Sequence, residues 1–227
     1  MTPGARRKTV AAMLVALLAA SALGYWGYST YRKRELQRTV LELVKNTSLR
    51  LRDSLGFESN APGTAESVRK LDDGVQEVDR RLADLRRMNA SPDRALVEAA
   101  DDYLFTSLQI LRTQASSHRY RLRLADSTQA LRMHMRNANR RNDAWIRDAL
   151  RTKDRAEKDY FDYKLSVEAF GRLLLSVSEV RTKLAVRADP ALLVADDLVM
   201  EAYKRALDTS KQTADGMEKA RQLAGPR

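Results

Sequence analysis

The sequence predicts an all-α protein in which an N-terminal transmembrane helix precedes an antiparallel bundle or coiled coil of four to five long helices. Three observations support this prediction. The chain of 227 residues has only 9 Gly and 5 Pro and is rich in Leu, Ala and Arg, which is typical of long helices. Apolar residues recur at spacings of three and four along most of the chain. One uncharged stretch near the N-terminus is long enough to cross a bilayer.

The uncharged stretch covers residues 10–28. At about 1.5 Å per residue it would span roughly 28 Å, close to the ~30 Å hydrocarbon core of a membrane. Three basic residues flank it on each side, and Tyr25, Trp26 and Tyr28 lie where aromatic rings favour the membrane–water boundary. We therefore expect residues 1–8 to form a short tail and residues 9–31 to form an uncleaved signal anchor.

Two alternatives to this anchor stay open. Ala20, Ser21 and Ala22 form a small-residue signature, so cleavage after Ala22 would make the segment a secretory signal. The basic residues are balanced across the stretch, so the bulk of the chain could also lie in the cytoplasm. A short basic N-terminus usually stays in the cytoplasm, which favours placing the bulk of the chain on the other side of the membrane. We expect a single-pass inner-membrane protein of a bacterium, with the C-terminal domain in the periplasm.

The domain at 32–223 is expected to contain helices at about 30–57, 65–89, 92–125, 143–187 and 190–223, followed by a frayed tail at 224–227. Gly56 and residues 59–63 break the first helix. Ser91 before Pro92 and Asp189 before Pro190 each combine a capping side chain with a proline at the first helical position. A turn or break is expected between residues 126 and 143, where large apolar residues are sparse.

The helix at 65–89 has the most regular apolar pattern. Its apolar residues step by three and four, and we call them the heptad seam: Val68, Leu71, Val75, Val78, Leu82 and Leu85. Nearly all other positions are polar, and so narrow an apolar face requires a partner helix. We expect an antiparallel hairpin with the helix at 30–57, and either a homo-oligomer or a helical protein partner.

Positive charge is concentrated in residues 118–155, which we call the arginine block. Ten Arg and one Lys stand there against four Asp, so the block carries +7 of the whole-chain net charge of +11. Two rows at i+4 spacing are the candidate residues for binding an anionic partner: Arg132, Arg136, Arg140, Arg147, Arg151 and Arg155. Such rows suit lipid headgroups, lipopolysaccharide or, if the domain is cytoplasmic, nucleic acid. The alternative is a solvated helix face, and nucleic acid is disfavoured because no base-reading module is visible.

Residues that carry chemistry are sparse. The chain has no Cys and only two His, and it contains no phosphate-binding loop and no nucleophile or metalloprotease motif. We therefore expect no catalytic, cofactor-binding or metal-binding residues. His118 lies on an apolar helix face and is expected to be packed there. The aromatic residues between Tyr160 and Tyr163 predict a helix–helix contact or, less favoured, a recognition patch.

These observations favour a non-enzymatic, membrane-anchored protein whose helical bundle acts as a scaffold, assembly or interaction factor in the bacterial cell envelope. A second hypothesis is a ligand-sensing or adaptor domain, which requires a polar pocket between helices. A third hypothesis is an arginine-rich binder of an anionic polymer.

Overall fold

The computed structural model describes the backbone of residues 3–57, 64–136 and 142–223, and their side chains apart from 3–16, 18, 19, 57 and 220–223. Within these ranges the chain is helical and contains no strand. The elements are α1 (Pro3–Phe57), α2 (Ala65–Arg87), α3 (Arg94–Arg136), α4 (Asp143–Ala185), the short 3-10 helix η1 (Pro190–Leu192) and α5 (Asp196–Leu223). The prediction of an all-α helical bundle is therefore confirmed.

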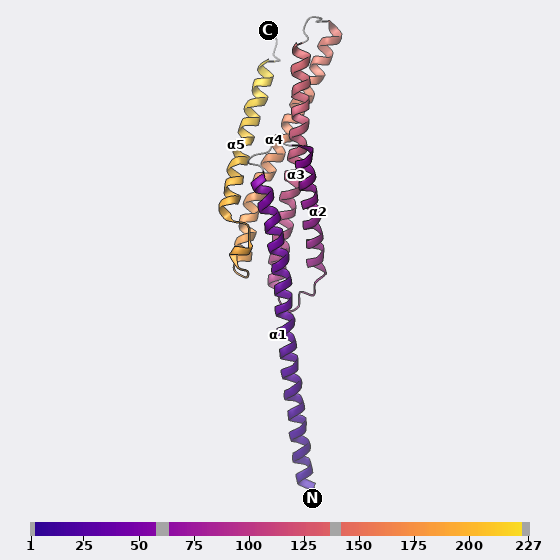
Figure 1. Ribbon diagram of the computed structural model, residues 1–227, viewed down its shortest axis with the longest axis vertical. Coiled ribbons are helices and arrows are strands. Elements are labelled where there is room, and N and C mark those ends of the chain that lie inside the picture. The colour runs from indigo at the N-terminus through magenta and orange to yellow at the C-terminus, as the bar shows by residue number, and fades with distance from the viewer. Residues whose placement is uncertain (1–2, 58–63, 137–141, 224–227) are drawn as a thin grey trace.

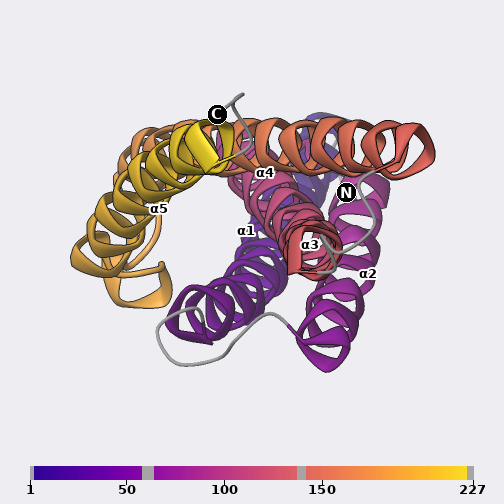
Figure 2. The same cartoon turned by 90° about the horizontal axis from the view of Figure 1, so that it is seen from above.

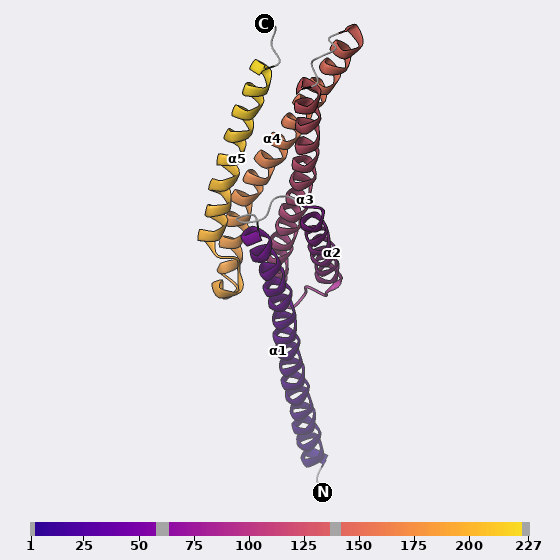
Figure 3. The same cartoon turned by 45° about the horizontal axis from the view of Figure 1, so that its top comes forward.

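The bundle is built around α3, which packs against α1, α2 and α4 (Figures 1 and 2). The most extensive packing joins α3 to α4 as a long antiparallel hairpin, and α5 lies along α4. Because α1 and α2 are shorter within the bundle than this hairpin, α3, α4 and α5 continue beyond them (Figure 3). The core is a single cluster of mainly Leu, Val and Ala side chains, with Tyr103 and Phe170 as its large aromatic members.

Helix α1 is one continuous helix whose N-terminal half projects away from the bundle (Figure 1). Its described side chains before Leu36 are almost all exposed, and from Val40 onward one face is buried. The bundle begins where Gln37 Nε2 donates to Asp93 Oδ2 over 2.7 Å and Lys33 Nζ lies 4.0 Å from the same carboxylate oxygen. The segment predicted as an anchor and the helix predicted at 30–57 are therefore parts of one helix in the structure.

The predicted anchor at 9–31 lies partly outside the residues whose side chains are described. Among the described residues, no helix contains a stretch that is both long and apolar enough to cross a membrane. This finding gives the predicted anchor no support. Its described apolar side chains are largely exposed, Leu23 at 68% and Trp26 at 70%.

Helix α2 begins with a capping box in which the Thr64 hydroxyl accepts from the Ser67 N–H over 3.2 Å and Ser67 Oγ accepts from the Thr64 N–H. The helix packs mainly on α3 and less on α1. Leu71, Val78, Leu82 and Leu85 of the heptad seam are buried, while its two remaining valines are partly buried. The seam therefore finds its partner helix within the same chain.

Helix α3 differs from its expected bounds of 92–125 at both ends. It begins at Arg94, because the Asp93 carboxylate, rather than Ser91, accepts from a first-turn N–H, that of Leu96, at 3.4 Å. It continues to Arg136 because the first half of α4 packs along it. At the far end the rings of His134 and Trp145 stack with centroids 4.9 Å apart, and His134 Nε2 lies 3.1 Å from the Trp145 carbonyl oxygen.

The expected helix at 190–223 is interrupted. Asp189 caps only a 3-10 turn, in which its carboxylate accepts from the Ala191 N–H over 2.9 Å. Leu193 and Val194 follow this turn and are buried in the core. Helix α5 begins only at Asp196. The cause is tertiary: the Val194 N–H donates to the Tyr103 hydroxyl over 3.2 Å, and an uninterrupted helix would not present it there.

The C-terminal end of α1 is held by side chains from two other helices. Gln114 Nε2 of α3 donates to the Ser54 carbonyl over 3.0 Å, and Arg205 Nη2 of α5 donates to the Leu55 carbonyl over 2.9 Å. The last carbonyl groups of a helix have no intrahelical donor and must be satisfied from elsewhere. These two contacts fix the point where α1 stops and the three-helix part of the bundle continues.

Candidate interaction site on the distal arm

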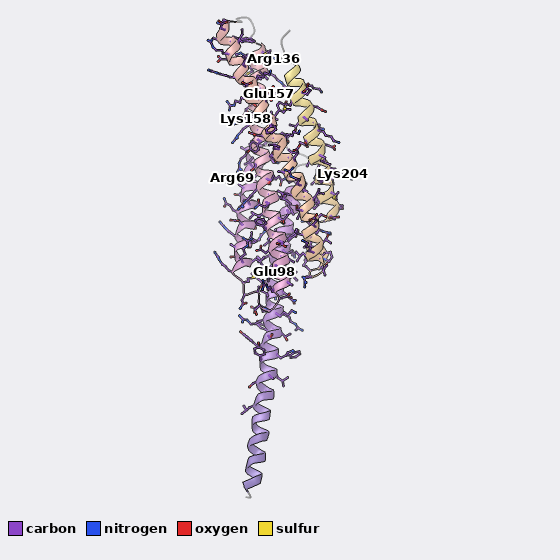
Figure 4. The ribbon with its side chains drawn as sticks, turned by 180° about the vertical axis from the view of Figure 1, so that it is seen from behind. Arg69, Glu98, Arg136, Glu157, Lys158 and Lys204 are labelled. Carbon is purple, nitrogen blue, oxygen red and sulfur yellow. The ribbon has the colours of Figure 1, made fainter. Side chains whose placement is uncertain are left out.

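The part of the bundle beyond the end of α1 forms what we call the distal arm: residues 120–136 of α3, 143–166 of α4 and 206–223 of α5. It lies at the opposite end of the molecule from the N-terminus. Figure 4 shows Arg136 near its tip and Glu98 near the opposite end of the bundle. The arm is therefore the part of the molecule farthest from the projecting half of α1.

Five of the six predicted anion-binding arginines lie on this arm. Arg132 and Arg136 are on α3, and Arg147, Arg151 and Arg155 are on α4; all five are exposed. Arg140 falls at 137–141, outside the described residues. The antiparallel hairpin of α3 and α4 thus brings the two rows, which are separated in sequence, to the same end of the molecule.

The rest of the bundle, which we call the lower bundle, has ion pairs that join several of its arginines to carboxylates across α2 and α3. Arg86 makes a two-point contact with Asp101 at 2.6 and 3.0 Å, which raises the pKa of the guanidinium, and Arg119 lies 2.6 Å from Asp72. Arg112 likewise lies 3.0 Å from Asp79. Exposed pairs of this kind contribute only about 0–1 kcal/mol each, but they leave this side of the molecule with little uncompensated charge.

Most arginines of the distal arm lack such partners. Among the described residues, no carboxylate lies within 4.0 Å of any of the following: Arg121, Arg123, Arg132, Arg136, Arg147 and Arg155. Arg151 has only a distant pair with Asp148 at 3.9 Å. Unpaired cations on one end of a protein create a positive potential that attracts anionic groups.

Helix α4 also carries apolar residues on its solvent side. Five of them, which we call the outer stripe, are between 40% and 54% exposed: Ile146, Leu150, Phe161, Leu165 and Leu175. At about 100° per residue their positions fall within a sector of roughly 100°. The buried side chains of α4, among them Ala156, Val167 and Leu174, lie on the opposite side of the helix. The outer stripe consists of two pairs at a spacing of four residues, Ile146 with Leu150 and Phe161 with Leu165, and the single Leu175. Between these groups the same sector of the helix carries charged residues: Asp154, Glu157, Glu168 and Arg172.

Arginine side chains border the outer stripe. Arg147 and Arg151 follow Ile146 and Leu150 directly in sequence and so lie one helical step, about 100°, from them. Further round, Arg151 and Arg155 line a shallow cleft of about 360 Å³ between α4 and α3, together with Asp126 and Ser127. An apolar strip with a cationic edge can bind a helix that has an apolar strip and an acidic edge.

The remaining sequence-predicted residues lie elsewhere. His118 is 5% exposed and lines a cleft between α3, α4 and α5, as do Tyr163 and Arg121. Among the described residues, no group of three or more potential ligands is placed to hold a metal ion. The predicted oligomer or helical partner is not tested by these contacts and stays a prediction.

The outer stripe is the feature that the sequence reasoning missed. Its signal was present in the spacing of four between Ile146 and Leu150 and again between Phe161 and Leu165. This signal does not show which apolar residues of α4 stay exposed, because that depends on which side of the helix α3 and α5 cover.

Comparison of the chain with models of protein families, with curated proteins and with solved structures finds no match.

Proposed function

We propose that this protein is a non-enzymatic, single-pass membrane protein whose helical bundle acts as a scaffold or interaction factor in the bacterial cell envelope. In this proposal the distal arm binds a helix of a partner protein along the outer stripe. The observation that carries the proposal is the outer stripe on the solvent side of α4, bordered by Arg147, which has no ion pair among the described residues, and by Arg151, whose one carboxylate partner there, Asp148, lies 3.9 Å away.

The stripe supports a protein partner because its members are large and spaced as helix-packing residues are. Leu150 and Phe161 are each 54% exposed, and Leu165 is 44% exposed. Single exposed apolar residues are normal on protein surfaces, but pairs at a spacing of four, such as Ile146 with Leu150 and Phe161 with Leu165, form larger apolar patches of the kind found at interaction sites. A partner helix with an acidic edge would also neutralise Arg147 and Arg151, which favours that partner over a purely apolar one.

The tether is proposed from the sequence of residues 9–31 and from the direction of α1. Residues 10–28 carry no charge, and basic residues stand on both sides of them. Helix α1 extends away from the bundle in one direction, and the distal arm extends in the other (Figure 1). A membrane at residues 9–31 would leave the arm at the far end, accessible to proteins in the periplasm.

Site-specific photocrosslinking in living cells tests the proposed surface. A photoreactive phenylalanine analogue replaces Leu150 or Phe161 in the full-length chain, and Gln76, which is exposed on α2, serves as the matched control position. We expect an adduct of defined mass from both stripe positions and none from position 76. Additional Arg147→Gln and Arg151→Gln substitutions are expected to reduce the yield, because they remove the cationic edge.

The adduct mass identifies the partner. An adduct at twice the mass of the chain indicates a second copy, and any other defined mass indicates a different protein. The absence of an adduct from every stripe position would contradict the proposed docking surface. If, in addition, the protein bound anionic vesicles in a way that required Arg132, Arg136, Arg147 and Arg155, the anionic-polymer hypothesis would replace it.

A further inference from the structure

A cleft of about 410 Å³ opens between α3, α4 and α5, just beyond the point where α1 ends. Its volume is within the range of small-molecule sites. Arg205, which donates to the last turn of α1, forms part of its wall, so the cleft lies where α1 leaves a gap among the other three helices. It is separate from the outer stripe and does not depend on the proposed function.

The cleft has an apolar floor. Val167 and Phe170 of α4 and Ala206 of α5 line it and are 6%, 4% and 7% exposed. These side chains belong to the core and are held in place by packing, so the floor is preformed. An apolar group of a few carbon atoms would lose water-exposed surface by lying on it.

The rim of the cleft offers one cation and one anion without ion-pair partners. Arg121 of α3 and Asp208 of α5 both line the cleft, and neither has an ion pair among the described residues. The other charged pair is engaged, since Arg205 Nη1 lies 3.4 Å from Glu201 Oε1. Arg205 Nε is buried and, in the described part of the chain, has no hydrogen-bond acceptor. Because that nitrogen has almost no accessible surface, a ligand in the cleft does not reach it, and Arg121 is the cation open to an anionic ligand group.

We propose that this cleft binds a free α-amino acid with an apolar side chain. The ligand carboxylate pairs with Arg121, the ammonium group pairs with Asp208, and the apolar side chain covers Phe170 and its neighbours. A ligand with only a negative charge would be repelled by Asp208, and a ligand with only a positive charge would be repelled by Arg121. A zwitterion satisfies both charges as well as the apolar floor.

Isothermal titration calorimetry on the full-length protein in a mild non-ionic detergent tests the ligand class. The probes are L-phenylalanine, 3-phenylpropionate, which lacks the amine, and phenethylamine, which lacks the carboxylate. We expect saturable binding of L-phenylalanine, and affinities about tenfold or more weaker for the two analogues, because each loses one charge-assisted hydrogen-bonding group.

Variants locate the site on the protein. Arg121→Gln and Asp208→Asn are each expected to weaken L-phenylalanine binding about tenfold or more. Arg123→Gln and Asp215→Asn are the matched controls, because these exposed residues lie on the same two helices outside the cleft lining. The controls are expected to bind as the unmodified chain does. Arg205 is left unchanged, because its removal would also unseat the end of α1.

Three outcomes would overturn the proposal. The first is no binding heat with L-phenylalanine up to its solubility limit. The second is binding of 3-phenylpropionate that equals or exceeds binding of the amino acid, which would make the ligand a simple organic anion. The third is binding that persists unchanged in both cleft variants. Failure of this experiment leaves the crosslinking result untouched, since the two surfaces share no residue.

Discussion

At the scale of single residues, Tyr103 of α3 connects segments that are far apart in the sequence: α1 and the connection between α4 and α5. Its hydroxyl lies 2.8 Å from Ser48 Oγ of α1 and accepts from the Val194 N–H at the start of α5. Ser48 Oγ in turn donates to the Val44 carbonyl, so the tyrosine hydroxyl is the donor to Ser48. One fully buried side chain thus ties α1 and the α4–α5 connection to the central helix.

Replacing this hydroxyl should destabilise the fold. In Tyr103→Phe the Val194 N–H and the Ser48 hydroxyl oxygen lose their partner in the core, so we expect the free energy of unfolding to fall by about 1–3 kcal/mol. Urea unfolding of the full-length protein in detergent, followed by circular dichroism, measures the change. Phe105→Tyr, at an exposed position on the same helix, should unfold as the unmodified protein does.

The free energy of unfolding of the same variant should also depend on pH differently from that of the unmodified protein. Burial raises the pKa of Tyr103 above its ordinary value of 10.0, although its hydrogen bonds with Ser48 and Val194 oppose the rise. The folded state therefore retains this proton at a pH where the unfolded chain releases it. Stability is then lost as the pH rises above about 10. The unfolding free energy of the unmodified protein should fall more steeply above that pH than that of Tyr103→Phe, and parallel curves would contradict this.

Residue chemistry alone could predict where the arginines gather but not which of them are paired. The composition of residues 118–155 shows the excess of positive charge directly. Whether a given arginine has an ion pair depends on what lies across from it. Arg119 faces Asp72 on α2, whereas Arg147 and Arg155 lie on α4, which packs on α3 and α5.

At the scale of elements, periodicity predicted the helices well where a single face is buried. The heptad seam and the face of α1 that includes Val40 and Leu51 follow the spacing of a helix with one apolar stripe. Prediction was poorer where other helices decide the outcome. The last turns of α3 are covered by α4, and the break before α5 places Val194 against Tyr103. Neither contact has a local signal in the sequence.

Substitution of two leucines, one buried and one exposed, distinguishes the core from the outer stripe. Leu82 of the heptad seam is 4% exposed, so Leu82→Asp should bury a carboxylate and lower the free energy of unfolding by more than about 3 kcal/mol. Leu150→Asp should change it by less than about 0.5 kcal/mol, because that side chain is already solvated. Urea unfolding of the two variants measures the difference.

The opposite result in either variant would contradict this prediction. A large loss of stability in Leu150→Asp would mean that the outer stripe belongs to the core of the folded unit, or to an oligomer required for folding. A small loss in Leu82→Asp would mean that α2 is not held by its seam.

At the scale of the whole molecule, two ends of different character are separated by a neutralised middle. The N-terminal half of α1 projects alone and carries exposed aromatic and aliphatic side chains, among them Trp26 and Leu23. The lower bundle pairs its charges between α2 and α3. The distal arm carries four of the five residues of the outer stripe and the arginines that have no ion pair among the described residues. This order along one axis is consistent with the proposed tethered interaction protein.

The proposed function requires that residues 9–31 hold this molecule in a membrane. Alkaline carbonate extraction of cell membranes tests it on the full-length chain, with a double variant, Leu17→Arg and Leu18→Arg, as the control. Two charges at the centre of the stretch make insertion costly. The account predicts that the unmodified chain stays in the membrane pellet and that the variant moves to the supernatant. Recovery of the unmodified chain in the supernatant, with its N-terminal residues still attached, would contradict it.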